Sequence, residues 1–417
     1  MTWLWEILVQ TARTVWAHKL RSALTMFGIA WGIAAIIFMM AIGDGFKIGY
    51  RNMLYVLGTD VVIVWGGRTT HQAGDQRAGR PIYLRYEDVA AIREECYLIA
   101  HVTPELDRSL NVTSPHNSGL FSTHGIAPVY QQIRSMDLAA GRRISESDFE
   151  ECRPVCVLGE QVRKQLFADR QAVGAEVRIL DIPFTVIGEL KPKDQNNSYN
   201  GLDGEKILIP YTTMARHFPD PRPFVGEGAL DNIIFCPVSA EVHKEAVRQV
   251  KTLLGRRHSF NPTDRGALWM WDTVETAQMV NRVYDSMQIF LAFVAVITLG
   301  LGGIGVMNIM LISVAERTRE IGIKQAIGAP PQRILAEFLL EALALTLTSG
   351  VAGVVFALAI CSLVNQLPLP TMFAGLPVTR ATALLAFGTL ALVGVLSAIY
   401  PARRASRLTP VEALRYE

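Results

Sequence analysis

Four long apolar stretches dominate the hydrophobic pattern of this chain. A helix needs roughly 20 apolar residues to cross about 30 Å of hydrocarbon, and the helices of soluble cores are seldom so long and so apolar. The stretches are residues 22–42, 286–315, 338–364 and 381–402. We therefore predict four membrane-spanning helices.

The segment at 43–285 has a different pattern. Short β-type runs such as EVRILDIPFTVIGEL are punctuated by Gly, Pro and Asp, whereas AEVHKEAVRQVKTLLGRR has helical periodicity. This mixture predicts an α/β domain that is large enough to bury its own core. The polar stretch at 191–205 predicts a mobile, exposed loop. The amphipathic run DTVETAQMVNRVYDSM predicts a stalk helix that continues into the second span.

Lys and Arg near the ends of the spans predict the orientation. They fall on one side of a four-span layout, and the positive-inside rule makes that side the cytoplasm. These residues are Arg13, Lys19, Arg21, Arg317, Arg319, Lys324, Arg333, Arg403, Arg404, Arg407 and Arg415. The first span is longer than a typical signal-peptide core, so we expect a retained anchor. Both termini are then cytoplasmic.

The predicted fold class is an α-helical membrane protein with four transmembrane helices and a large α/β extracytoplasmic domain between helices 1 and 2. Trp and basic residues at 1–21 predict an amphipathic helix in the cytoplasmic lipid interface. The expected order is this helix, the span at 22–42, the α/β domain at 43–285, the span at 286–315, a cytoplasmic helix and loop at 316–337, the span at 338–364, a short periplasmic loop at 365–380, the span at 381–402 and a cytoplasmic tail at 403–417.

The composition and the motifs argue against several classes of function. The net charge is only +2, which argues against a nucleic-acid partner because such a partner requires a concentrated basic face. The sequence has no phosphate-binding P-loop, no HExxH and no GxSxG motif, so we expect no catalytic residue, cofactor or metal in this chain. Disulfides and buried thiols both remain open for Cys96, Cys152, Cys156 and Cys236.

The segment ERTREIGIKQAIGA is compact and charged, and it lies between two apolar stretches. Glu320 and Lys324 form a favourable i,i+4 pair, while Gly328 and the Pro residues after Ala329 predict the end of a helix. The helix either rests in the headgroups or docks into a soluble partner. Its candidate contact residues are Glu316, Arg317, Thr318, Arg319, Glu320, Ile321, Gly322, Lys324, Ala326, Gly328 and Ala329.

Three further groups of residues are candidate functional sites. Acidic Glu337 and Glu341 lie near the start of the third span, where a local role at the interface is expected. Small residues in the second span predict close helix packing, either within the chain or between subunits; they are Gly300, Gly302, Gly303 and Gly305. The tail either braces the cytoplasmic contact or anchors to lipid through Arg403, Arg404, Arg407, Glu412 and Leu414.

The chain resembles the FtsX-like permease family, and most closely its MacB-type members. The resemblance rests on ERTREIGIKQAIGA, EFLLEALALTLTSGVAG and YPARRASRLTPVEALRYE, and it continues through LRSALTMFGIAWGIAAII and KILIPYTTM over nearly the whole chain. It implies the membrane subunit of a mechanotransmitting ABC transporter in a bacterial inner membrane. MacB carries a fused nucleotide-binding domain that this sequence does not show, so we expect a separate cytoplasmic ABC ATPase subunit that binds ATP and Mg²⁺.

The same resemblance implies further partners. A second permease chain is expected, with a homodimer favoured over a heterodimer, together with membrane lipid, a periplasmic adaptor and an outer-membrane channel. The implied function is efflux or export across the envelope. Two alternatives from the same family are a lipoprotein-releasing Lol-type permease and an FtsX-like regulator of cell-wall hydrolases, although the latter has a smaller outer loop.

Overall fold

The structure is a computed structural model that describes residues 19–58, 60–73, 75–195, 198–222, 225–226 and 228–409, without the side chain of Arg21. It divides into two compact units, a helical one from Met1–Gly49 and Val280–Glu417 and an α/β one from Tyr50–Met279. Most of the interfacial helix predicted at 1–21 lies outside the described residues.

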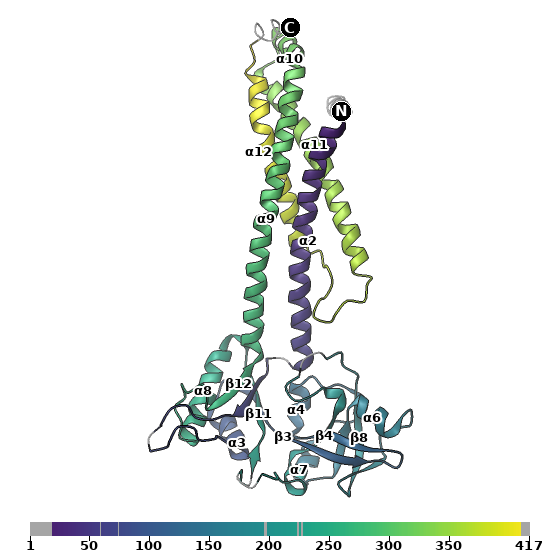
Figure 1. Cartoon of the computed structure of the whole chain (residues 1–417), viewed down its shortest axis with the longest axis vertical. Coiled ribbons are helices and arrows are strands. Elements are labelled where there is room, and N and C mark those ends of the chain that lie inside the picture. The colour runs from purple at the N-terminus through teal and green to yellow at the C-terminus, as the bar shows by residue number, and fades with distance from the viewer. Residues whose placement is uncertain are drawn as a thin grey trace. The chain divides into compact units, whose positions relative to one another are not determined.

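The helical unit contains the four apolar helices that the sequence predicts (Figure 1). They are α2 (Lys19–Leu57), α9 (Thr273–Glu316), α11 (Pro331–Val364) and α12 (Arg380–Ser406). Each is long and apolar enough to cross a membrane, and each contains one predicted span. The short α10 (Thr318–Ala326) lies between α9 and α11 in the chain.

Small residues bring the helices of this unit together. A Cβ added to Gly302 on α9 would lie 3.2 Å from backbone atoms of α2 at Gly28 and Ile29, tighter than an ordinary contact, so glycine favours this close approach. Around this crossing, Ile29, Ile33 and Leu299 are buried in one apolar cluster. The same cluster continues to α10, α11 and α12, so these helices share a core.

The α/β unit is built on a ten-stranded mixed sheet. The strand order is β12-β1-β11-β3-β4-β9-β6-β8-β5, with β7 paired to β3 and β8. The strands are β1 (Val62–Gly66), β3 (Ile99–Thr113), β4 (Ser118–Ile126), β5 (Leu138–Gly141), β6 (Val155–Leu158), β7 (Glu176–Ile179), β8 (Ile182–Leu190), β9 (Lys206–Pro210), β11 (Asn232–Pro237) and β12 (Leu268–Asp272). A separate ladder joins β2 (Leu84–Arg85) and β10 (Ala229–Leu230).

Apolar residues alternate along these strands, so each face of the sheet has its own core. Val62 and Val64 of β1 pack into one core, whereas Ile63 packs into the other. The helices of this unit are α3 (Tyr86–Glu95), α4 (Pro128–Ile133), α5 (Glu146–Glu150), α6 (Glu160–Phe167), α7 (Tyr211–His217) and α8 (His243–Arg257), with short 3₁₀ turns η1 (Asp203–Glu205) and η2 (Ala240–Val242). The predicted α/β character is confirmed.

Two predictions for segments of the α/β domain can be compared with the structure. The amphipathic run is helical and continues into the second predicted span, because α9 runs unbroken from Thr273 to Glu316, and its role as a stalk stays a prediction. The polar composition of residues 191–205 predicts an exposed loop, and this is wrong for Tyr199 and Asp203, since Asp203 is only 1% exposed and Tyr199 is half-buried. Its polar side chains enter a buried ionic network. All five cysteines are free thiols.

Candidate functional site

The charged segment forms the predicted short helix, α10, at one end of the helical unit. Only Arg317 separates α10 from α9, and the hydroxyl of Thr318 donates to the carbonyls of Val314 and Ala315 at 3.0 and 2.8 Å. After α10, Gly328 adopts φ +96°, a conformation that costs little only for glycine. Pro331 then opens α11, so the predicted helix stop is confirmed.

Ion pairs tie α10 to its neighbouring helix. The ammonium group of Lys324 lies 3.0 Å from Glu320, which confirms the predicted i,i+4 pair, and 2.8 Å from Glu337 on α11. Burial disfavours the charge on Lys324, but its hydrogen bonds to Glu337 and Glu320 outweigh that effect and raise its pKa. The spacing predicts only the pair within α10, because the contact to α11 depends on the turn between the helices.

A second ion pair joins the end of α9 to α11. The guanidinium group of Arg317 lies 3.3 Å from Glu341, whose side chain is almost fully buried. A carboxylate this far from water needs such a cation. Glu337 and Glu341, predicted as interfacial acids, are therefore the α11 partners of the charged segment.

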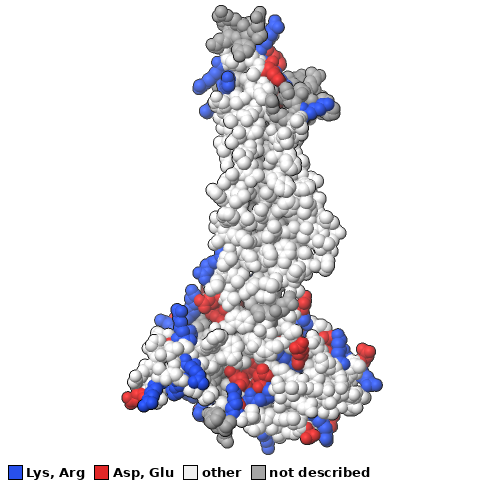
Figure 2. Space-filling model, in the orientation of Figure 1, with Lys and Arg blue, Asp and Glu red and all other residues white. Residues whose placement is uncertain are grey.

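One face of α10 is buried and the other is exposed. Ile321 packs into the helical core with Gly322 buried beside it. In contrast, Ile323 and Ile327 are 48% and 80% exposed. The exposed face of α10 combines apolar side chains with the charges of Arg319 and Glu320 and includes Ala326, and it is flanked by the exposed Glu316 at the end of α9 and the exposed Gly328 after α10. Basic side chains gather at this end of the helical unit, while the stretch of helix next to it shows no charge on the visible face (Figure 2).

The end of α12 also carries exposed cations. Arg403, Arg404 and Arg407 are exposed, whereas the neighbouring Ala402 and Ala405 are buried in the helical core. Alternation of this kind holds the helix end against its neighbours and leaves the guanidinium groups outside. Glu412 and Leu414, predicted to join the same contact, lie outside the described residues.

Three of the four predicted glycines of α9 lie against other helices of the same chain. An added Cβ at Gly302, Gly303 or Gly305 would meet α2 or α12 of the same chain at 2.8 to 3.2 Å. These three glycines therefore serve internal packing. Gly300 meets nothing within 4 Å, so a subunit contact stays a prediction for this position.

The structure also reveals a buried polar network in the α/β unit that sequence reasoning missed. Its centre is the fully buried Glu105 of β3. Side chains from separate elements hydrogen-bond to this carboxylate at 2.6 to 3.1 Å; they are His124, Tyr130, Tyr199, Asn200 and Asn232. Burial alone would raise the pKa of Glu105, but the hydrogen bond and charge of His124 and the positive charge of Lys206 lower it well below its usual range.

This network holds the end of α2. Asp203 binds Arg134, Lys193 and Lys206 at 3.0 to 3.2 Å. In turn, Arg134 donates to the carbonyl of Leu57 at 2.6 Å and Lys193 donates to that of Val56 at 3.2 Å. The last carbonyls of a helix have no partner within it and carry partial negative charge. The two cations therefore act as a C-terminal cap for α2.

The start of α9 is fixed by a different set of contacts in the same unit. Asp272 accepts hydrogen bonds from the backbone N–H groups of Val274 and Glu275 at 2.8 and 2.9 Å, which is N-capping by an acidic side chain. Asp272 is opposite Val62 in the β1–β12 ladder. Since β1 follows α2 and β12 precedes α9, the two helices enter the sheet through adjacent, paired strands.

Four apolar helices, with a large mixed α/β domain inserted after the first, define a multi-pass membrane protein. Family models agree with this class. Residues 22–253 match the MacB-like periplasmic core domain, and residues 292–410 match the FtsX-like permease C-terminal. The chain belongs to the FtsX-like permease family, in its MacB-like branch, and is thus a multi-pass inner-membrane component of a transport system.

Its relatives extend over more sequence than this chain. It is 31% identical over 414 residues to the macrolide export ATP-binding/permease protein MacB of Bdellovibrio bacteriovorus, covering 99% of this chain and 62% of that protein. For the protein of the same name from Wolinella succinogenes, the identity is 32%, with 99% and 61% covered. The chain therefore spans about three fifths of the length of these relatives.

Solved structures give weaker matches. The periplasmic region of MacB from Actinobacillus actinomycetemcomitans aligns with a TM-score of 0.42 at 20% identity, covering 55% of this chain and 97% of that one. The extracellular domain of the noncanonic ABC-type transporter YknZ from Gram-positive bacteria aligns with a TM-score of 0.41 at 17% identity, covering 51% and 100%.

Proposed function

We propose that this chain is the permease part of a MacB-type ABC transporter that couples ATP hydrolysis to movement of its outer domain and so drives efflux or export. The observation that carries this proposal is the double tie of the charged segment to α11. Lys324 binds Glu337 while Arg317 binds Glu341. A force on α10 would therefore act on α9 and α11 together.

The orientation follows from charge. Lys324, Arg333 and the arginines at the end of α12 belong on the cytoplasmic side by the positive-inside rule. Both termini are then cytoplasmic, and the α/β unit is periplasmic. Under this orientation, α10 is the described helix best suited to meet an ABC nucleotide-binding domain, because it is short, charged and joined directly to two spans.

ATP and Mg²⁺ bind to that nucleotide-binding domain, and the residues of this chain supply no group to the hydrolysis. Two nucleotide-binding domains close together around ATP in this superfamily, so two permease chains are expected in the assembly, a homodimer before a heterodimer. A periplasmic adaptor and an outer-membrane channel would complete the export route.

The continuity of α9 supports mechanical transmission. A tilt of α9 relative to α2 would act on the β1–β12 ladder, because α9 follows β12 directly and α2 is joined to β1 through the short segment 58–61. Movement of the outer domain then requires no substrate passage between the spans.

A cross-linking experiment tests the proposed contact. A cysteine at Ile327, which directly follows α10 and is 80% exposed, should cross-link to the nucleotide-binding domain in the assembled transporter. A cysteine at Met372, which is 46% exposed in the loop between α11 and α12, is the matched control and should not. Cross-linking of Met372 in place of Ile327, or of neither residue, would reject the proposed docking surface.

A further inference from the structure

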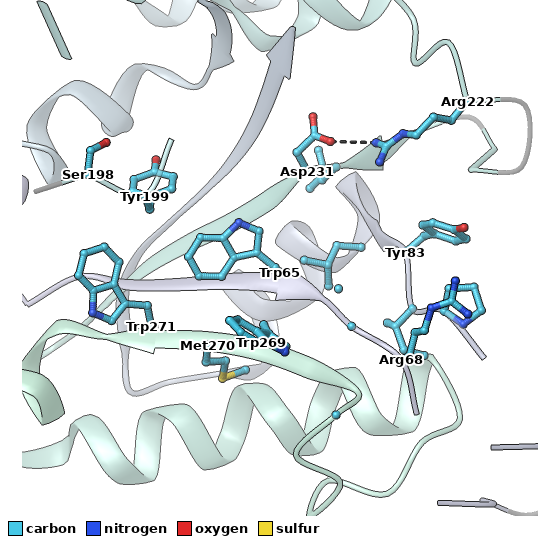
Figure 3. Close-up of a pocket in the computed structure, with 17 residues that line it drawn as sticks. Trp65, Arg68, Tyr83, Ser198, Tyr199, Arg222, Asp231, Trp269, Met270 and Trp271 are labelled. Carbon is cyan, nitrogen blue, oxygen red and sulfur yellow. Dashed lines mark hydrogen bonds and ion pairs between the residues drawn. The ribbon is translucent and has the colours of Figure 1, made fainter. Parts of the chain in front are cut away.

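The α/β unit contains a large pocket rich in aromatic side chains at the edge of its sheet. Its volume is about 1140 Å³, which accommodates a drug-sized molecule. Trp65 on β1 lies opposite Trp269 on β12, and Trp271 is two residues further along β12. Since side chains two apart on a strand share a face, all three indoles line the same side of the sheet (Figure 3).

Other elements complete the walls of the pocket. The ring of Tyr199 meets that of Trp65 edge to face, with the centroids 5.9 Å apart. Arg68 and Tyr83 lie at the opposite end from Trp271 (Figure 3). Trp269 as a whole residue is nevertheless 71% exposed. The domain core therefore leaves much of this aromatic surface in contact with water, which is typical of a binding site.

The charges of the pocket favour an anion. Arg222 and Asp231 form an ion pair at 2.9 Å, so their charges offset each other. The guanidinium group of Arg68 donates a hydrogen bond to the carbonyl of Gly79 at 3.4 Å. Among the described residues it has no other side-chain hydrogen bond and no acidic partner. The lining therefore has one positive charge beside the indoles that is not neutralised.

We propose that this pocket binds a small molecule that has a planar aromatic or conjugated body and at least one anionic group. The indoles of Trp65, Trp269 and Trp271 stack against the planar body. Arg68 pairs with the anionic group at the other end, where a planar guanidinium suits carboxylates, sulfonates and phosphates. This site goes beyond the proposed coupling function, because binding here requires neither ATP nor a nucleotide-binding domain.

Dye binding to the full chain in lipid nanodiscs tests this proposal. The probe is 8-hydroxypyrene-1,3,6-trisulfonate, a planar anion that stays in water, and its fluorescence polarisation reports binding. The cationic dye proflavine has a planar body of opposite charge. We expect the anionic dye to bind at least tenfold more tightly than proflavine, and Trp269→Ala to weaken its binding at least tenfold.

Matched variants separate the site from general effects. Arg68→Gln should weaken binding of the anionic dye about fivefold or more and leave proflavine unchanged. The controls Tyr97→Ala, at a ring 79% exposed elsewhere in the unit, and Arg170→Gln, at another exposed arginine, should bind like the parent. Trp269 is too exposed for its truncation to unfold the domain, so lost binding reports the site itself.

Three outcomes would overturn the proposal. The first is equal affinity for both dyes, which would remove the preference for an anion. The second is unchanged binding in Trp269→Ala, which would place the dye elsewhere. The third is loss of dye binding as protein concentration rises, which would show that a second copy of the chain covers the pocket through β12. None of these outcomes bears on the coupling role of α10.

Discussion

Reversing the charge of Glu320 separates a coupling helix from a helix that merely lies at the membrane surface. Glu320→Arg places a cation on the exposed face of α10, where the glutamate side chain is 47% exposed. The helix itself should survive. Lys324 loses one carboxylate but keeps Glu337 at 2.8 Å, and Arg317 keeps Glu341.

These contacts give the expected change in stability and in affinity for the nucleotide-binding domain. An exposed i,i+4 pair contributes about 0.3 to 0.5 kcal/mol, and a like-charge pair costs a similar amount. The substitution should therefore change the free energy of unfolding by less than about 1 kcal/mol. If Glu320 meets a basic group of the nucleotide-binding domain, reversal there leaves like charges face to face. The affinity should then fall at least tenfold, or about 1.4 kcal/mol.

The assay compares three quantities in the assembled transporter: association of the nucleotide-binding domain, ATP hydrolysis and export. Glu245→Arg is the matched control, because Glu245 is a similarly exposed helix carboxylate, 42% exposed and paired with Arg248 at 2.7 Å in the α/β unit. Only Glu320→Arg should lose association or uncouple hydrolysis from export. If it assembles, hydrolyses ATP and exports like the parent, α10 is a surface helix and the coupling argument fails.

Three further predictions follow from the topology and the buried charges. Single cysteines should react with a membrane-impermeant thiol reagent from the cytoplasmic side at Ile327 and from the periplasmic side at Tyr97; the reverse pattern would overturn the orientation. Arg134→Met should lower the free energy of unfolding by about 2 to 4 kcal/mol, because the Leu57 carbonyl loses its buried donor while Asp203 keeps two cations. An unchanged midpoint in thermal or chemical unfolding would show that the cap on α2 contributes nothing to stability. Hydrogen bonds from Arg222 lower the pKa of Asp220 to about 2 in the folded protein, below its value in the unfolded chain. The ionised carboxylate therefore stabilises the fold fully above about pH 4, and this stabilisation is lost as the pH falls through 2. Asp220→Asn should flatten this part of an acid-unfolding curve.

The helices could be predicted from sequence because their signals are local. Uncharged runs of about 20 residues have few alternatives to a span. The segment from Glu316 to Ala329 contains its own pairing and stop signals, and the structure has both the Glu320–Lys324 pair and the turn at Gly328. The extension of α2 to Leu57 was missed, because its last residues mix charged and apolar side chains without a clear period.

The buried network could not be predicted, because its members come from distant segments. Glu105, His124 and Asp203 meet only when β3, β4 and η1 are brought together by the sheet. Each looks like an ordinary surface residue in its own segment. For the same reason, the polar composition of residues 191–205 predicts exposure. In the structure, however, Asp203 pairs with the cations Arg134, Lys193 and Lys206, and Tyr199 donates a hydrogen bond to Glu105.

The two helix ends in the α/β unit differ in how they can respond to force. The end of α2 is held by hydrogen bonds from the fully buried Arg134 and from Lys193 to the carbonyls of Leu57 and Val56, and a hydrogen bond to a charged group contributes about 1.5 to 3 kcal/mol. The start of α9 instead follows β12, an edge strand held on one side only by β1. A tilt of α9 should therefore displace β12 before it pulls α2 from its cap. Since Trp269 and Trp271 lie on β12, the aromatic pocket is the part of this unit that such a movement would reshape first.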